Sequence, residues 1–213
     1  MLPGIIPQID ILTIRVIPED NKGEGLIMAF SQYSQSLVAE VNNVITRVHP
    51  AEVQQIVDAI MHTRRLFLEG RGRSGLMMRA FAIRLTHLDL HCHVVGESTT
   101  PSLQVGDLLL VGSGSGETIT PILAARAAKT AGGLVAVFTS RRESTLAQLA
   151  DMTVLIPAPV REQSAEEPVT TIQPMGSLFE QSLLLLLDSI VLLLKDRLRQ
   201  DERMMMTRHS NLE

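Results

Sequence analysis

Apolar residues recur every three or four positions in the first part of the chain, a spacing that predicts two amphipathic helices ahead of any strand. The first predicted helix covers residues 29–48, and its apolar positions are Leu37, Val41, Val44, Ile45 and Val48. Pro50 suits the first turn of a second helix. The apolar positions of that helix are Val53, Ile56, Val57, Ile60 and Met61. Each helix therefore has an apolar face that a core must cover.

Short apolar runs then alternate with helical patterns. Five strands are predicted, at residues 66–69, 91–95, 107–112, 134–139 and 152–156. Helices are predicted up to about residue 88 and at residues 119–131, 146–150 and 175–199. Strands that are apolar throughout, and that are joined through helices, are typical of a parallel sheet covered on both faces. The pattern predicts an α/β fold, a three-layer α-β-α sandwich around a five-stranded parallel sheet of flavodoxin-like order 2-1-3-4-5.

Residues 1–27 differ from the rest of the chain, because they contain three prolines and three glycines and show no clean period. They also lack the basic opening of a secretory signal, and Asp10 and Arg15 interrupt their apolar stretch. We expect an N-terminal extension over residues 1–27, either disordered or the product of an upstream start codon. A single folded domain is expected over residues 28–213.

Composition narrows the classes of partner. The net charge of −4 argues against nucleic acid and anionic membranes. The single cysteine, Cys92, excludes an internal disulfide and fits a reducing compartment, so a cytoplasmic location is expected. The apolar run Leu183–Leu194 contains Asp188 and is too short to span a bilayer, which predicts a buried helix. That helix carries apolar residues around its whole circumference, so all of its sides must be covered. We therefore expect a second subunit to cover part of it, with full burial in one chain as the alternative.

Two loops rich in glycine and serine follow the first and third predicted strands. In the expected strand order these strands are neighbours at the switch point, where ligands bind beside the carboxyl ends of the strands. Glycines let successive backbone N–H groups form an anion-binding nest, and a following helix N-terminus favours negative charge. The loops therefore predict a phosphate site. The candidate substrate-binding residues are Arg73, Ser74, Ser113, Gly114, Ser115, Gly116, Glu117 and Thr118.

Some features of these segments have other interpretations. Serine and threonine are common helix caps, so each loop alone is also typical of an ordinary turn. Glu117 is a poor neighbour for phosphate, and we expect it to turn away and brace its loop. The run from Gly70 to Gly75 matches G-x-G-x-x-G, with Glu97 near the position of a ribose-binding acid, which is the pattern of a dinucleotide site. The second serine loop and the bulky arginines argue against that alternative.

The segment His91-Cys92-His93 invites a zinc interpretation. In a strand, however, the two histidines share a face while Cys92 points the other way. No CxxC motif accompanies them. No metal site and no cofactor are therefore expected.

Several segments resemble the SIS sugar isomerases, and among them the 6-phospho-3-hexuloisomerase family. They are GRGRSG, FAIRLTHLDL, VVGESTTPSL, GDLLLVGSGSGETIT, QPMGSLFEQSLLLLLDSIV and the closing RHSNLE. The resemblance runs from about residue 28 to residue 213. Residues 1–27 have no counterpart in it, and Asp89 stands where the family pattern has glycine.

The resemblance implies isomerisation of D-arabino-hex-3-ulose 6-phosphate to fructose 6-phosphate through an enediol, without metal or redox cofactor. It implies that Glu180 is the base, although an acid in the first turn of a helix also stabilises the helix dipole. It implies a second role for His87, as proton donor or ring-opening acid that can reach the pocket of a neighbouring subunit, and a homotetramer built as a dimer of dimers. The alternatives are another aldose-ketose phosphate isomerase on the same scaffold, or a non-catalytic sugar-phosphate sensor.

Overall fold

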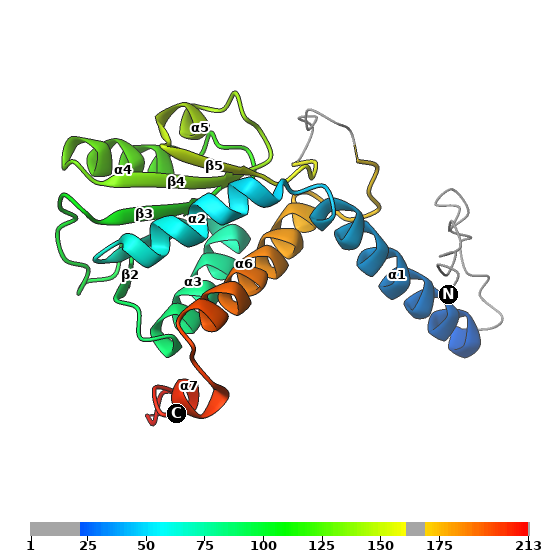
Figure 1. Ribbon diagram of the computed structural model, residues 1–213. Coiled ribbons are helices and arrows are strands. Elements are labelled where there is room, and N and C mark those ends of the chain that lie inside the picture. Colours follow the sequence, from blue (N-terminus) through cyan, green and yellow to red (C-terminus); the bar gives the residue numbers. More distant parts are fainter. Residues whose placement is uncertain (1–21, 161–168, 213) are drawn as a thin grey trace.

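A five-stranded parallel sheet forms the middle layer of the computed structural model, which describes residues 22–160 and 169–212 (Figure 1). The strands are β1 (Leu66–Gly70), β2 (Cys92–Val94), β3 (Leu108–Gly112), β4 (Leu134–Thr139) and β5 (Met152–Leu155). Their order is β2-β1-β3-β4-β5, and every neighbouring pair is parallel. The predicted fold class and strand order are confirmed.

Helices cover both faces of the sheet (Figure 1). Those in the described part of the chain are α1 (Lys22–Ile45), α2 (Pro50–His62), α3 (Gly72–His87), α4 (Ile119–Thr130), α5 (Thr145–Leu149), α6 (Ser177–Arg197) and α7 (Glu202–Met206). Successive strand residues point to opposite faces, and on β1 this sends Leu66 and Leu68 into a core shared with α1, α2, α3 and α6. Phe67 points into a smaller core shared with α4 and α5.

The first helix begins earlier than its apolar pattern predicted. α1 starts at Lys22 rather than at Ala29, and its N-terminal half projects beyond the sandwich (Figure 1). Apolar side chains on this half, among them Leu26, Ile27 and Phe30, are exposed. The domain boundary expected at residue 28 falls inside α1, and residues 1–21 lie outside the described residues.

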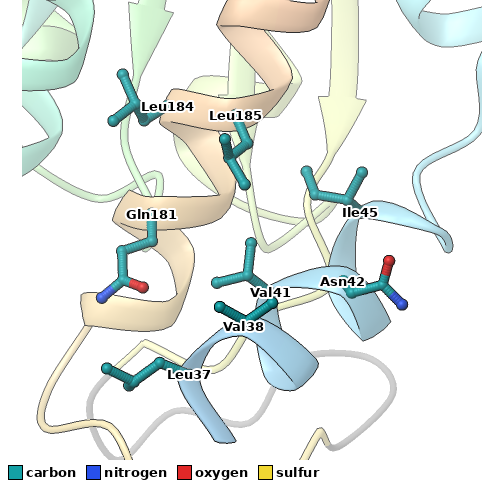
Figure 2. Close-up of a pocket in the computed structure, with 8 residues that line it drawn as sticks. All are labelled: Leu37, Val38, Val41, Asn42, Ile45, Gln181, Leu184 and Leu185. Carbon is teal, nitrogen blue, oxygen red and sulfur yellow. The ribbon is translucent and has the colours of Figure 1, made fainter. Parts of the chain in front are cut away.

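The C-terminal half of α1 and the adjoining face of α6 enclose an apolar groove of about 450 Å³ (Figure 2). Val41 from α1 faces Leu185 from α6 across it (Figure 2), and Val38 and Leu184 also line it. Val38 and Leu185 are exposed although both are apolar. The groove is therefore an exposed apolar patch, whose contact with water is unfavourable.

Among the described residues, α6 is the helix whose length and composition would suit a membrane span, because it has 21 residues and is mostly apolar. The predicted buried run Leu183–Leu194 is thus only part of a longer helix. Half of its most apolar stretch is buried, and α6 packs against α1, α2 and α3. This packing is that of a core helix with one open side, on which Leu185, Leu192 and Leu193 are exposed.

The turn after α3 explains why glycine is the expected residue at position 89. Asp89 has φ +68°, in the left-handed region that glycine occupies without steric cost. Its N–H donates to the carbonyl of Thr86, and the N–H of Leu90 donates to the carbonyl of Leu85. These two bonds form the Schellman motif that ends a helix. A carboxylate of Asp89 also accepts from Arg208, which ties the C-terminal segment to this turn.

Candidate active site

The first loop makes a tight turn between β1 and α3 because two glycines lie against each other. A Cβ on Gly75 would lie 2.5 Å from the carbonyl oxygen of Gly70, so only glycine fits there. Gly72 has φ +56° and opens the helix directly after the strand. Arg73 and Ser74 consequently lie in the first turn of α3, at the carboxyl edge of the sheet.

The second loop is held by bonds to the neighbouring strand. The N–H of Ser113 donates to the carbonyl of Phe138, and the carbonyl of Gly114 accepts from both the N–H and the hydroxyl of Ser140. Gly116 has φ +65°, and its N–H donates to the carbonyl of Ser113. The loop is thus a preformed turn that leads into the N-terminus of α4.

The hydroxyl groups of this loop lie close together. The Oγ of Ser113 is 3.3 Å from the Oγ1 of Thr118, and the Oγ of Ser115 accepts from the N–H of Glu117. Gly70 of β1 is in register with Gly112 of β3, so the two loops begin side by side. The structure therefore brings Arg73 and Ser74 to the same edge as Ser113–Thr118.

Glu117 differs from its neighbours in the loop. Its carboxylate accepts from the N–H of Thr145 at 2.8 Å and from the hydroxyl of Thr145 at 2.7 Å. These contacts cap the short helix α5 and join it to the loop. The contacts of Glu117 are thus those of a brace, as expected for an acid that turns away from a phosphate.

Glu180 lies in the first turn of α6 and reaches the first loop. Its N–H donates to the carbonyl of Gly176, and its Oε2 is 2.5 Å from the Nε of Arg73. The Glu180 side chain is mostly buried, whereas that of Arg73 is 58% exposed. The structure thus places the candidate base beside the candidate phosphate site, with its carboxylate held by a cation of α3.

His87 is not near Glu180 within the chain. It is the last residue of α3, fourteen residues after Arg73, which corresponds to about 21 Å along the helix axis. Its ring is buried and stacks on His209 with centroids 5.3 Å apart. The Nη1 of Arg84 lies 3.4 Å from its Nδ1. The candidate residues therefore form one group at the loops, and His87 lies at the far end of α3.

The residues behind the two rejected alternatives have other contacts. The thiol of Cys92 lies against the hydroxyl of Thr86 and the carbonyl of Ala82, and burial raises its pKa. The ring of His93 packs against Phe67. The carboxylate of Glu97, the candidate ribose acid, pairs with Arg79 at 2.6 Å.

Sequence reasoning missed Glu69, the penultimate residue of β1. Its side chain is 1% exposed, and its Oε1 lies 2.9 Å from the Nε of Arg71. Burial raises the pKa of this carboxyl group, and Arg71 offsets only part of that rise. The signal in the sequence was an acid at the end of an otherwise apolar strand, LFLEG.

Glu69 makes the stability of the protein depend on pH in a predictable direction. Because its pKa is higher in the folded chain than the ordinary 4.5, its contribution to stability is largest below pH 4.5 and is lost as pH rises through the folded value. We expect the unfolding free energy of the parent, relative to Glu69→Gln, to fall as pH rises above 4.5. Urea unfolding across this range measures it. Glu97→Gln, which removes an exposed acid, controls for the loss of one negative charge, and an equal trend in both variants would contradict the assignment to Glu69.

Comparison with known proteins adds the family. The SIS domain family matches residues 59–185, a range that includes both loops and Glu180. A Bacillus subtilis protein named 3-hexulose-6-phosphate isomerase is 41% identical over 87% of this chain and 100% of its own length. A Mycobacterium gastri protein of the same name is also 41% identical, over 82% of this chain and 86% of its own.

A solved structure agrees with these matches. It is a hypothetical protein of Methanococcus jannaschii for which a 3-hexulose-6-phosphate isomerase function was inferred. It is 28% identical to this chain, with a TM-score of 0.73 over 85% of this chain and 99% of its own. The loops, the strand order and these matches agree, and the chain belongs to the SIS domain family.

Proposed function

We propose that this protein isomerises D-arabino-hex-3-ulose 6-phosphate to D-fructose 6-phosphate, the step that follows formaldehyde fixation in the ribulose monophosphate pathway. The observation that carries the proposal is the position of Glu180, whose carboxylate pairs with Arg73 of the first glycine-serine loop, while the second loop begins beside the first. The relatives named 3-hexulose-6-phosphate isomerase support the choice of substrate, because this chain matches them over most of its length.

The reaction needs a base beside a bound ketose phosphate. Glu180 removes the proton from C2, next to the C3 carbonyl, the electron pair forms the C2–C3 double bond, and the C3 oxygen takes up a proton to give an enediol. The C2 hydroxyl then loses its proton and becomes the carbonyl while C3 takes up a proton, so the substrate undergoes no net gain or loss of protons or electrons. A carboxylate on a rigid helix suits this role, because general-base catalysis requires a fixed distance to the carbon that loses its proton.

The phosphate binds at the second loop in this proposal. The backbone N–H groups of Gly114 and Ser115, the hydroxyls of Ser113, Ser115 and Thr118, and the N-terminus of α4 all favour an anion. Ser74 and Arg73 complete the site from the first loop. Glu117 contributes by bracing the loop through Thr145 rather than by touching the phosphate.

A coupled assay tests the reaction. Hex-3-ulose 6-phosphate is generated in place from formaldehyde and ribulose 5-phosphate, and fructose 6-phosphate is detected with auxiliary enzymes. Rapid formation of fructose 6-phosphate supports the proposal. Absence of turnover, together with thermal stabilisation by other sugar phosphates, would reject this substrate and favour a different isomerase or a sensor.

Assembly forms part of the same proposal. The groove between α1 and α6 and the exposed leucines of α6 support a homotetramer, a dimer of dimers, because a second copy would cover apolar surface that one chain leaves open. His87 then serves the site of a neighbouring subunit, since it lies far from Glu180 in its own. Light scattering tests the assembly, and a monomer at micromolar concentration would contradict it.

The free Cys92 supports a cytoplasmic location.

A further inference from the structure

Glu40 on α1 is a buried acid whose partners all come from one distant segment. The residue is 6% exposed. Its Oε2 accepts from the hydroxyl of Thr171 at 2.6 Å and from the side-chain amide of Gln173 at 2.9 Å. Its Oε1 accepts from the backbone N–H of Ile172 at 2.9 Å. A single carboxylate thus fixes the hydroxyl, the backbone and the amide of three consecutive residues.

The fixed segment leads directly into the helix of the candidate base. Only Pro174, Met175 and Gly176 separate Gln173 from the first residue of α6. Met175 has φ +57°, a conformation that a side chain rarely adopts, so the chain makes a sharp and specified turn there. The N–H of Glu180 donates to the carbonyl of Gly176. The position of the candidate base therefore depends on the path of the backbone between Gln173 and Gly176.

The three bonds are of the strong kind. All three donors are uncharged, and the acceptor is a carboxylate, which makes hydrogen bonds shorter and stronger than those between neutral groups. The N–H of Gln173 also donates to the hydroxyl of Thr171, so the segment is held from within as well as from α1. Loss of the charge at Glu40 would leave several donors competing for one neutral oxygen.

We propose that Glu40 is a positioning residue for the isomerisation, fixing the segment of residues 171–176 so that the Glu180 carboxylate meets the substrate carbon at the required distance. The inference rests on the function proposed above. Its effect falls on the catalytic step, because small displacements of a catalytic group cost rate far more than they cost phosphate affinity.

Glu40→Gln is the first variant, since it keeps the size of the side chain and removes one acceptor. An amide at position 40 then faces the amide of Gln173, and the segment loosens. We expect kcat to fall by about tenfold to a hundredfold with KM changed by less than about threefold. Amide hydrogen exchange of peptides covering residues 171–180 is expected to become faster.

The second variant tests whether the pairing itself matters. Glu40→Gln combined with Gln173→Glu exchanges the two groups across the same contact. The new carboxylate accepts from the new amide, while the remaining oxygen at position 40 still accepts from Ile172. We expect this double variant to recover most of the lost kcat and the slow hydrogen exchange.

Glu52→Gln is the matched control. Glu52 lies on α2, is mostly buried, and its carboxylate likewise accepts from a distant backbone N–H, that of Leu155, while pairing with Arg142. It does not hold the segment before α6, so it should lower the melting temperature without a selective loss of kcat.

Three outcomes would overturn the inference. They are a Glu40→Gln enzyme with parental kcat, a loss of kcat that Glu52→Gln shares in proportion to its loss of stability, and a double variant no better than Glu40→Gln. A parent enzyme without turnover would instead overturn the proposed function, and the positioning role with it.

Discussion

Glu180→Gln is expected to lower turnover of hex-3-ulose 6-phosphate by about a thousandfold, the usual contribution of a general base. The amide has the size of the carboxylate and can still accept from Arg73, whose Nε is 2.5 Å from Oε2 in the parent. It cannot take up the proton of the substrate carbon. The coupled assay measures the loss as kcat, at substrate concentrations well above KM.

Binding separates a lost base from a damaged site. Because the two loops stay intact, Glu180→Gln should be stabilised thermally by fructose 6-phosphate as much as the parent is. Asp188→Asn is the control, since Asp188 is an exposed acid on the same helix and undergoes the same chemical change. Activity of Glu180→Gln within tenfold of the parent would remove Glu180 as the base.

The second large effect is expected at Gly116, the glycine of the second glycine-serine loop that has φ +65°. A Cβ there would lie 2.1 Å from the Oγ of Ser144 and 2.4 Å from its Cβ. Ser144 is fully buried, and its Oγ accepts from the N–H of Ala147 to cap α5, so it has little room to move. Gly116→Ala must therefore push the loop away from the N-terminus of α5.

We expect Gly116→Ala to cost about 2–4 kcal/mol of unfolding free energy, from left-handed strain and overpacking together, and to raise KM at least about tenfold through the displaced phosphate donors. Urea unfolding and the coupled assay measure the two effects. Gly72→Ala is the matched control for strain, because Gly72 has φ +56° and nothing lies within 4 Å of an added Cβ. An equal loss of stability in both variants would show that the contact with Ser144 is unimportant.

The sequence pattern was sufficient for the sheet and for the place of the loops. Continuous apolar runs such as that of β3 and the glycines that follow them are local features, so their order along the chain predicted parallel strands and two neighbouring loops. The bracing role expected for Glu117 also has a local origin, since an acid inside a turn rich in glycine and serine has few other positions. The start of α1 was harder to predict, because two glycines among residues 22–28 weaken the helical pattern.

One contact that the sequence analysis missed is local, and the other joins residues far apart in the chain. Glu69 stands out only as an acid in an apolar strand, and its pairing with Arg71 depends on the turn between them. Glu40 lies between the apolar positions Leu37 and Val41 of α1, but its partners are 131 to 133 residues later. No periodicity in the sequence predicts such a contact, because only the packing of α1 against the segment before α6 brings these residues together.

The bonds of Glu40 also define how much of the chain is needed for a complete unit. The match to the SIS domain family covers residues 59–185 and so contains both loops and Glu180 but not α1. A fragment cut at those limits would keep Thr171, Ile172 and Gln173 and remove the carboxylate that receives their three hydrogen bonds. Each lost hydrogen bond to a charged acceptor costs about 1.5–3 kcal/mol. We accordingly expect the smallest stably folded fragment of this protein to be longer than residues 59–185, the range that matches the SIS domain family.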